Sequence, residues 1–194
     1  LRDPVVIPGE VGDATDVTIT VGSDKPLVLH RANDEWTMSG GALNVQGLAG
    51  DSATIGTLVS DLKNLRASKF SDAAGDLKSI GLDPPVAKVE LALPAESRHE
   101  VLLIGKEAAE KLAPVMLQGE PTVYMVKSDD VATLTPDALA LRDHAVQRLT
   151  ADDIREIAIS GPGANGGTAT TLQRAGTTWK LGEGDKAGSA DETK

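Results

Sequence analysis

The chain has 194 residues, of which 40% are hydrophobic and 25% are charged, a composition ordinary for a soluble globular fold with one core and part of a second. Its 29 acidic residues outnumber its 19 basic residues, and the net charge of −10 argues against binding to nucleic acid or to an anionic membrane surface. The chain has no cysteine, which excludes disulfides and thiolate metal sites, and no apolar run of about 18 residues, so we expect no direct membrane insertion of this stretch.

Apolar and polar residues alternate with a period of two in many short stretches, which is typical of half-buried strands. Residues 1–13 are rich in Pro and Gly and are predicted to be a linker. The strands are expected at residues 16–21, 26–31, 35–38, 66–70, 86–93, 100–104, 115–117, 122–126, 146–149, 154–160, 168–174 and 178–181. The first three predict an antiparallel meander, and the last three predict another.

The longest helix is expected at residues 51–65, with Asp51 or Ser52 as its cap. Its apolar residues have helical spacing and should cover the sheet. They are Ile55, Leu58, Val59, Leu62 and Leu65. Shorter helical pieces are predicted at residues 71–80, at 106–112, at 129–134 behind a Ser128 cap, and from 135–137 onward. The tail at 182–194 is rich in Gly, Asp and Lys and is predicted to be disordered.

One stretch of sequence occurs twice. Leu-His-Arg-Ala-Asn-Asp-Glu-Trp at 29–36 returns as Leu-Gln-Arg-Ala-Gly-Thr-Thr-Trp at 172–179, with four residues kept at one offset of 143. We therefore predict an α+β fold of mainly antiparallel sheet, in meanders and hairpins, with a few covering helices. Residues 14–149 would form one full repeat unit, and 150–181 the opening meander of a second. A meander without its covering helix would expose an apolar face that needs cover from the first unit, a partner or other residues.

Other motifs follow the first meander in a fixed order. They are Ile80-Gly81-Leu82-Asp83-Pro84-Pro85, Leu103-Ile104-Gly105, Val123-Tyr124-Met125-Val126 and Leu141-Arg142-Asp143. Over residues 14–181 the pattern resembles the DUF4340 family of bacterial proteins of unknown function. The resemblance implies a place outside the cytoplasm, anchoring by an N-terminal transmembrane helix that this sequence lacks, and a link to ABC-type transport systems related to gliding motility. It implies no catalytic residues.

The repeated residues Arg31, Trp36, Arg174 and Trp179 are the main candidates for a site. One interpretation is a repeated recognition patch. The favoured interpretation is structural, because repeated units reuse their core residues. In that interpretation each Trp fills the space between meander and helix, and each Arg pairs with a nearby acid or lies along the sheet.

Other residue patterns that suggest chemistry have simpler explanations. Residues 161–166 spell G-x-G-x-x-G, but β-branched residues follow instead of a helix, which favours a hairpin loop over a dinucleotide site. The carboxylate pairs at 129–130 and 152–153 follow Ser128 and Thr150, where acids favour helix starts. The three histidines, at positions 30, 99 and 144, lack the close spacing of metal ligands. The sequence therefore predicts no catalytic residue, no cofactor and no metal.

The expected function is a non-catalytic, extracytoplasmic assembly module that binds partner proteins as an accessory to an ABC-type transporter. Two alternatives stay open, namely a module that binds a glycan or other small ligand, and a hydrolase whose site forms only in the fold. A deep pocket with polar groups of shifted pKa would favour the enzyme. A groove displaying Trp or Tyr would favour a glycan, and an open sheet edge or an apolar patch would favour assembly.

Overall fold

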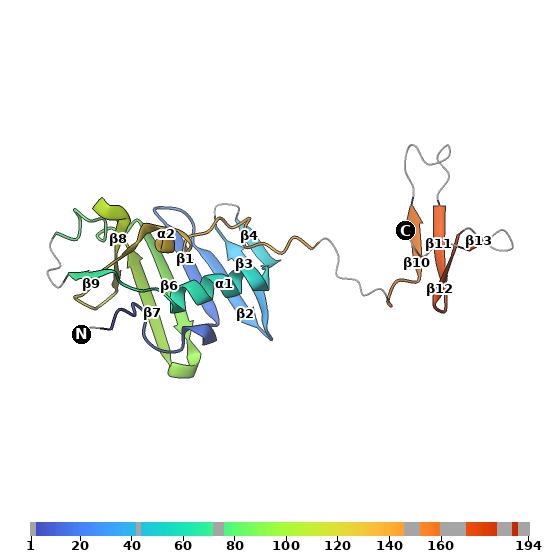
Figure 1. Ribbon diagram of the computed structural model, residues 1–194, viewed down its shortest axis with the longest axis horizontal. Helices are drawn as coiled ribbons and strands as arrows, with labels where there is room; N and C mark the ends of the chain where they lie inside the picture. The colour runs from blue at the N-terminus through green and yellow to red at the C-terminus, as the bar shows by residue number, and fades with distance from the viewer. Residues whose placement is uncertain are drawn as a thin grey trace. The chain divides into compact units, whose positions relative to one another are not determined.

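The computed structural model describes residues 3–41, 44–71, 76–145, 152–159, 170–181 and 188–189. The chain divides into two compact units, Leu1–His144 and Ala145–Lys194 (Figure 1). Each unit is built on an antiparallel sheet, and the longest helix of the described residues packs on the larger sheet. The expected α+β class with mainly antiparallel sheet is confirmed.

The first unit is a nine-stranded sheet in the order β4-β3-β2-β1-β6-β7-β8-β9-β5. The strands are β1 (Asp16–Val21), β2 (Leu27–Ala32), β3 (Glu35–Gly40), β4 (Val45–Ala49), β5 (Lys69–Ser71), β6 (Ala87–Leu93), β7 (Arg98–Ile104), β8 (Leu112–Leu117) and β9 (Val123–Lys127). β1, β2 and β3 form the predicted first meander, and β6–β7 and β8–β9 form the two predicted hairpins. The meander and the hairpins join because β1 also pairs with β6.

The helix α1 (Ser52–Lys63) lies across one face of this sheet (Figure 1). Asp51 is its N-cap, and the carboxylate of Asp51 accepts a 2.7 Å hydrogen bond from the backbone N–H of Thr54. The buried residues of the helix are Ile55, Leu58, Val59 and Leu62, which confirms the predicted apolar face. These side chains share one core with the inward-facing residues of β1, β2 and β3.

The segment predicted as a linker is part of the core. Val6, Ile7 and Val11 are buried, and Val11 opens a short 3-10 helix, η1 (Val11–Asp13). The backbone N–H of Val6 donates to the carbonyl of Leu65 at 3.2 Å, which ties the segment to the chain that leaves α1. The linker prediction is wrong because tertiary contacts, rather than local Pro and Gly content, decide the packing of these residues.

A second, smaller core lies around Leu82, Met116 and Val123. Two glycines allow the segment of residues 80–85 to reach the end of β7. A Cβ on Gly81, whose φ is +73°, would lie 2.8 Å from the backbone nitrogen of Lys106. A Cβ on Gly105 would lie 2.5 Å from the carbonyl oxygen of Ile80. The Ile-Gly-Leu and Leu-Ile-Gly motifs therefore pack against each other, and their glycines allow the two backbones to approach closely.

The shorter helical pieces differ from the prediction. In the predicted helix at 71–80, Ser71 instead ends β5 and residues 77–80 form turns. The other pieces are η2 (Pro94–Glu96), η3 (Ala109–Lys111) and α2 (Ser128–Ala132). Ser128 does not cap α2, because Lys127 occupies the N-cap position and the Ser128 hydroxyl is buried with no hydrogen-bond partner. Residues 135–137 begin no helix, and Asp137 instead accepts a hydrogen bond from the N–H of Leu139.

The second unit contains a four-stranded antiparallel sheet in the order β10-β11-β12-β13. The strands are β10 (Glu156–Ile159), β11 (Thr170–Ala175), β12 (Thr178–Leu181) and β13 (Gly188–Ser189). The first three form the meander that the sequence predicted. The tail expected to be disordered contributes β13, which pairs with Lys180 and Leu181. The strand expected at 146–149 and the rest of that tail lie outside the described residues.

Candidate functional site

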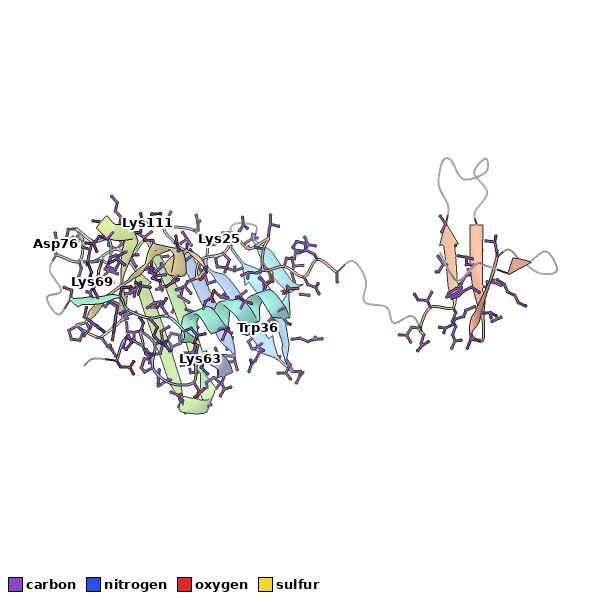
Figure 2. The ribbon with its side chains drawn as sticks, viewed as in Figure 1. Lys25, Trp36, Lys63, Lys69, Asp76 and Lys111 are labelled. Carbon is purple, nitrogen blue, oxygen red and sulfur yellow. The ribbon has the colours of Figure 1, made fainter. Side chains whose placement is uncertain are left out.

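The first candidate pair, Arg31 and Trp36, occupies directly opposite positions on β2 and β3. The guanidinium carbon of Arg31 lies 5.8 Å from the centroid of the Trp36 ring, within the range of a cation–π contact. Trp36 is buried at the N-terminal end of α1, where its Cβ and the side chain of Ile55 both approach Gly50 (Figure 2). These contacts support the structural interpretation of this pair.

The second candidate pair, Arg174 and Trp179, has the same cross-strand position on β11 and β12. The Arg174 guanidinium pairs with the carboxylate of Asp152 at 3.0 Å and donates from Nε to the carbonyl of Gly176 at 3.2 Å. Trp179 is half-buried. The structure therefore places each arginine opposite the tryptophan of its own meander.

The hydrogen bonds next to each arginine also match between the meanders. The backbone N–H of Arg31 donates to the carbonyl of Thr15 at 2.7 Å, and that of Arg174 donates to the carbonyl of Arg155 at 2.8 Å. One residue earlier, a polar side chain meets an acid on the neighbouring strand in both units. These pairs are His30 with Asp16 at 2.7 Å and Gln173 with Glu156 at 3.0 Å.

The two meanders differ in how well their apolar faces are covered. In the first, Val17 and Ile19 of β1 and Met38 of β3 are exposed by 0%, 4% and 1%. The matching positions of the second are Ile157, Ile159 and Leu181, which the pairing with β11 fixes. They are exposed by 38%, 54% and 44%. The second meander thus presents an apolar face, which the sequence had predicted from the position of the helix in the first unit.

A hollow of about 390 Å³ opens in the first unit between the β1–β2 end and the segment 135–139. Ile19, Leu27 and Ala138 line it, and the more exposed Val21 and Leu139 lie at its rim. Lys25 also lines it, and its ammonium donates to the Asn44 side chain at 3.0 Å. Sequence reasoning missed this hollow because its walls come from segments more than 90 residues apart, which no local pattern connects.

The patterns that suggested metal or acid–base chemistry remain scattered. Among the described residues, no group of three His, Cys, Asp or Glu side chains could hold a metal ion. His30 lies next to Asp16, and His99 lies 4.0 Å from Glu90. The acids at 129–130 and 152–153 are exposed. The G-x-G-x-x-G stretch at 161–166 lies outside the described residues.

Among the described residues, two carboxyl groups have a resolved shift in pKa, and in each case hydrogen bonds to a nearby residue are the main cause. Hydrogen bonds from the backbone N–H and the side chain of Thr54 hold the pKa of Asp51 below its usual value, while partial burial and the nearby Asp143 act in the opposite direction. A hydrogen bond and the charge of the Lys69 ammonium lower the pKa of Glu110. Asp51 is partly exposed at a helix cap, and Glu110 is exposed in a surface ion pair with Lys69.

The remaining family motif, Leu141-Arg142-Asp143, holds the start of α1. The backbone N–H of Asp51 donates to the Leu141 carbonyl at 2.8 Å, and that of Asp143 donates to the Ala49 carbonyl at 3.0 Å. Leu141 itself is fully buried. The motif therefore has a structural role in the first unit.

Across the part of the chain that the structure describes, no helix is long and apolar enough to cross a membrane.

Comparison with known proteins gives one match. No curated protein and no solved structure matches the chain. A family model described as "Domain of unknown function (DUF4340)" matches residues 43–194, a range that begins after the first meander and includes α1, the two hairpins and the whole second unit. The chain belongs to the DUF4340 family.

Proposed function

We propose that this chain is a non-catalytic assembly module that acts outside the cytoplasm and binds partner proteins as an accessory to an ABC-type transporter. The observation that supports it most is the exposed apolar face of the second meander, formed by Ile157, Ile159 and Leu181. Contiguous exposed apolar surface of this kind marks protein–protein contact sites.

A further part of the proposal is that the two meanders are copies of one building block. The matched Arg–Trp pairs and the matched bonds of Arg31 and Arg174 to the preceding strand support it. The polar pairs support it as well. Asp16 and His30 are 14 residues apart, and Glu156 and Gln173 are 17 residues apart. This difference fits the same meander with a longer loop between its first two strands.

A binding role is favoured over hydrolysis by the chemistry of the described surface. A hydrolase needs a nucleophile or base whose pKa a cleft perturbs. Neither of the two described carboxyls with a shifted pKa is buried, and neither lines the hollow between β1 and segment 135–139. The place outside the cytoplasm, the membrane anchor and the transporter partner rest on the family resemblance.

The test is affinity purification of the full-length protein from membranes of its native host after cross-linking. The expected result is recovery of transporter subunits, with recovery reduced by Ile159→Ser and Leu181→Ser and unchanged by Val28→Ser, which alters an exposed apolar residue of the first unit. Recovery of no partner, together with turnover of a substrate by the purified protein, would show that the proposal is wrong.

A second candidate function is favoured by the hollow in the first unit. Its volume of about 390 Å³ and its mainly apolar lining suit a small apolar ligand. No aromatic residue lines it, so it does not favour a glycan. A fluorescent apolar dye should lose affinity on Leu139→Arg and keep it on Leu181→Arg if the hollow is the binding site, and the reverse pattern would assign the dye to the second meander.

A further inference from the structure

The apolar side chains of the second meander form one continuous face, of which Ile157, Ile159 and Leu181 are exposed. Ile157 lies opposite Leu172, and Leu172 lies opposite Leu181 on its other side. Ile159 and Trp179 extend the same face along β10 and β12, because residues two apart in a strand point to the same side. The other side of the sheet carries polar groups such as Glu156, Gln173 and Lys180. The face is therefore a defined apolar patch with a polar reverse.

The first unit shows what covers such a face. There, α1 lies across β1, β2 and β3 (Figure 1). Its buried residues Ile55, Leu58, Val59 and Leu62 share one core with the equivalent residues of these strands. The four residues have spacings of 0, 3, 4 and 7, the stripe of an amphipathic helix. The second meander has the same strand order and register, and apolar residues at most of the matching positions, with Thr170 in place of Leu27. Such a face accepts the same kind of cover.

Charge at one end of the face adds a preference. Arg155 precedes β10 and, by strand alternation, belongs to the same side as Ile157 and Ile159. Arg155, Arg174 and Asp152 line a hollow at this end, where Asp152 already pairs with Arg174. The first unit has the neutral Thr15 at the position of Arg155, since both carbonyls accept from the repeated arginine. The extra cation favours an acidic residue in whatever lies over it.

We propose, as a refinement that rests on the proposed function, that the face of Ile157, Ile159, Leu172, Trp179 and Leu181 binds an amphipathic helix of a partner protein. That helix carries apolar side chains at spacings of 0, 3, 4 and 7 and an acidic residue at the end that meets Arg155. It lies across β10, β11 and β12 as α1 lies across β1, β2 and β3.

The probe for the test is a synthetic, fluorescently labelled peptide with the sequence of residues 51–65, which is α1 with its cap. It carries the required apolar stripe and two acids, Asp51 and Asp61. Its binding to the full chain is measured by fluorescence anisotropy. The expected result is saturable binding that weakens at least tenfold on Ile159→Ser or Leu181→Ser and is unchanged on Val28→Ser. A peptide with Leu58→Asp and Leu62→Asp should not bind.

Three outcomes would overturn this inference. Binding that persists in the Ile159→Ser and Leu181→Ser variants would place the peptide elsewhere, for example in exchange with α1, and would overturn the proposal. So would sedimentation data showing that the chain dimerises and that Leu181→Ser makes it monomeric, since a second copy would then cover the face. Recovery of transporter subunits by a chain that does not bind the peptide would overturn this inference and leave the proposed function standing.

Discussion

Arg31 and Trp36 lie directly opposite each other on β2 and β3, with the guanidinium carbon of Arg31 5.8 Å from the centre of the indole. Arg174 and Trp179 have the same cross-strand relation in the second unit. The two tryptophans nevertheless differ in environment, because Trp36 is buried against α1 and Trp179 is half-buried. Equal positions in the strand pairing therefore do not imply equal energetic roles.

The first prediction compares the two tryptophans. Trp36→Ala should lower the free energy of unfolding of the first unit by about 3–5 kcal/mol, because it empties a core position. Trp179→Ala should leave that transition unchanged, because Trp179 belongs to the other unit. Urea unfolding followed by circular dichroism measures both, and Trp36→Phe serves as the milder variant if the alanine protein does not fold. Equal losses for the two alanine variants would contradict the prediction.

The second prediction uses two glycines of opposite environment. Gly105→Ala should destabilise the first unit by about 1–3 kcal/mol, since the new Cβ meets the backbone carbonyl of Ile80 at 2.5 Å and backbone cannot move aside cheaply. Gly56→Ala should stabilise it by up to about 1 kcal/mol, because Gly56 lies inside α1 with open space at its Cβ. Thermal unfolding of both variants beside the unaltered chain would show shifts of opposite sign, and two shifts of the same sign would contradict this account.

The third prediction concerns the buried hydroxyl of Ser128. It has no hydrogen-bond partner, so Ser128→Ala should be neutral or should raise the free energy of unfolding by about 1 kcal/mol. Ser39→Ala is the contrast, because the Ser39 hydroxyl accepts a 2.9 Å bond from the N–H of Gly47, and its loss should cost about 0.5–1.5 kcal/mol. Chemical denaturation measures both changes. A clear loss of stability in Ser128→Ala would show that the hydroxyl has a partner after all.

The fourth prediction concerns pH and the helix cap. The pKa of Asp51 is lower in the folded chain than its ordinary value of 3.8, so the ionised cap stabilises the fold above that pH. That contribution is lost as the pH falls through the folded pKa. The stability difference between the unaltered chain and Asp51→Ala should therefore be full at neutral pH and shrink in acid.

Asp51→Asn is the control for the fourth prediction, since Asn can cap a helix and does not titrate. Its advantage over Asp51→Ala should stay constant between neutral and acidic pH. Thermal unfolding of the three proteins at several pH values makes the comparison. An Asp51→Ala difference that is the same at every pH would mean that the charge of the cap does not contribute.

Much of the fold could be predicted because it is encoded in local patterns. Period-two alternation places the strands of both meanders, and the spacing from Ile55 to Leu62 behind Asp51 defines α1. The repeat of Arg and Trp predicted two copies of one structural feature. That each Arg lies opposite its Trp across a two-residue turn is a finding of the structure. The exposed apolar face of the second meander was predicted from its period-two alternation and from the helix that covers the matching face of the first meander.

The rest depends on contacts between distant residues. Ser128 has the right residue type for a cap, but β9 runs straight into α2 and leaves Lys127 at the N-cap position. Turns occupy residues 77–80, where Leu77 and Ile80 pack on the smaller core around Leu82. The hollow between Val21 and Leu139 forms only when the segment 135–139 returns to the β1–β2 end. Single-sequence patterns contain none of this information.

The packing of Val6, Ile7 and Val11 beneath the sheet has a practical consequence for anyone who prepares fragments of this protein. Removing the first 13 residues would remove these three buried side chains. It would also remove the backbone hydrogen bond from Val6 to the carbonyl of Leu65, just after α1. A fragment meant to contain the first unit should therefore begin no later than Pro4, whose carbonyl accepts from the N–H of Ala67. A purification tag at that end would need a spacer to leave the buried stretch undisturbed.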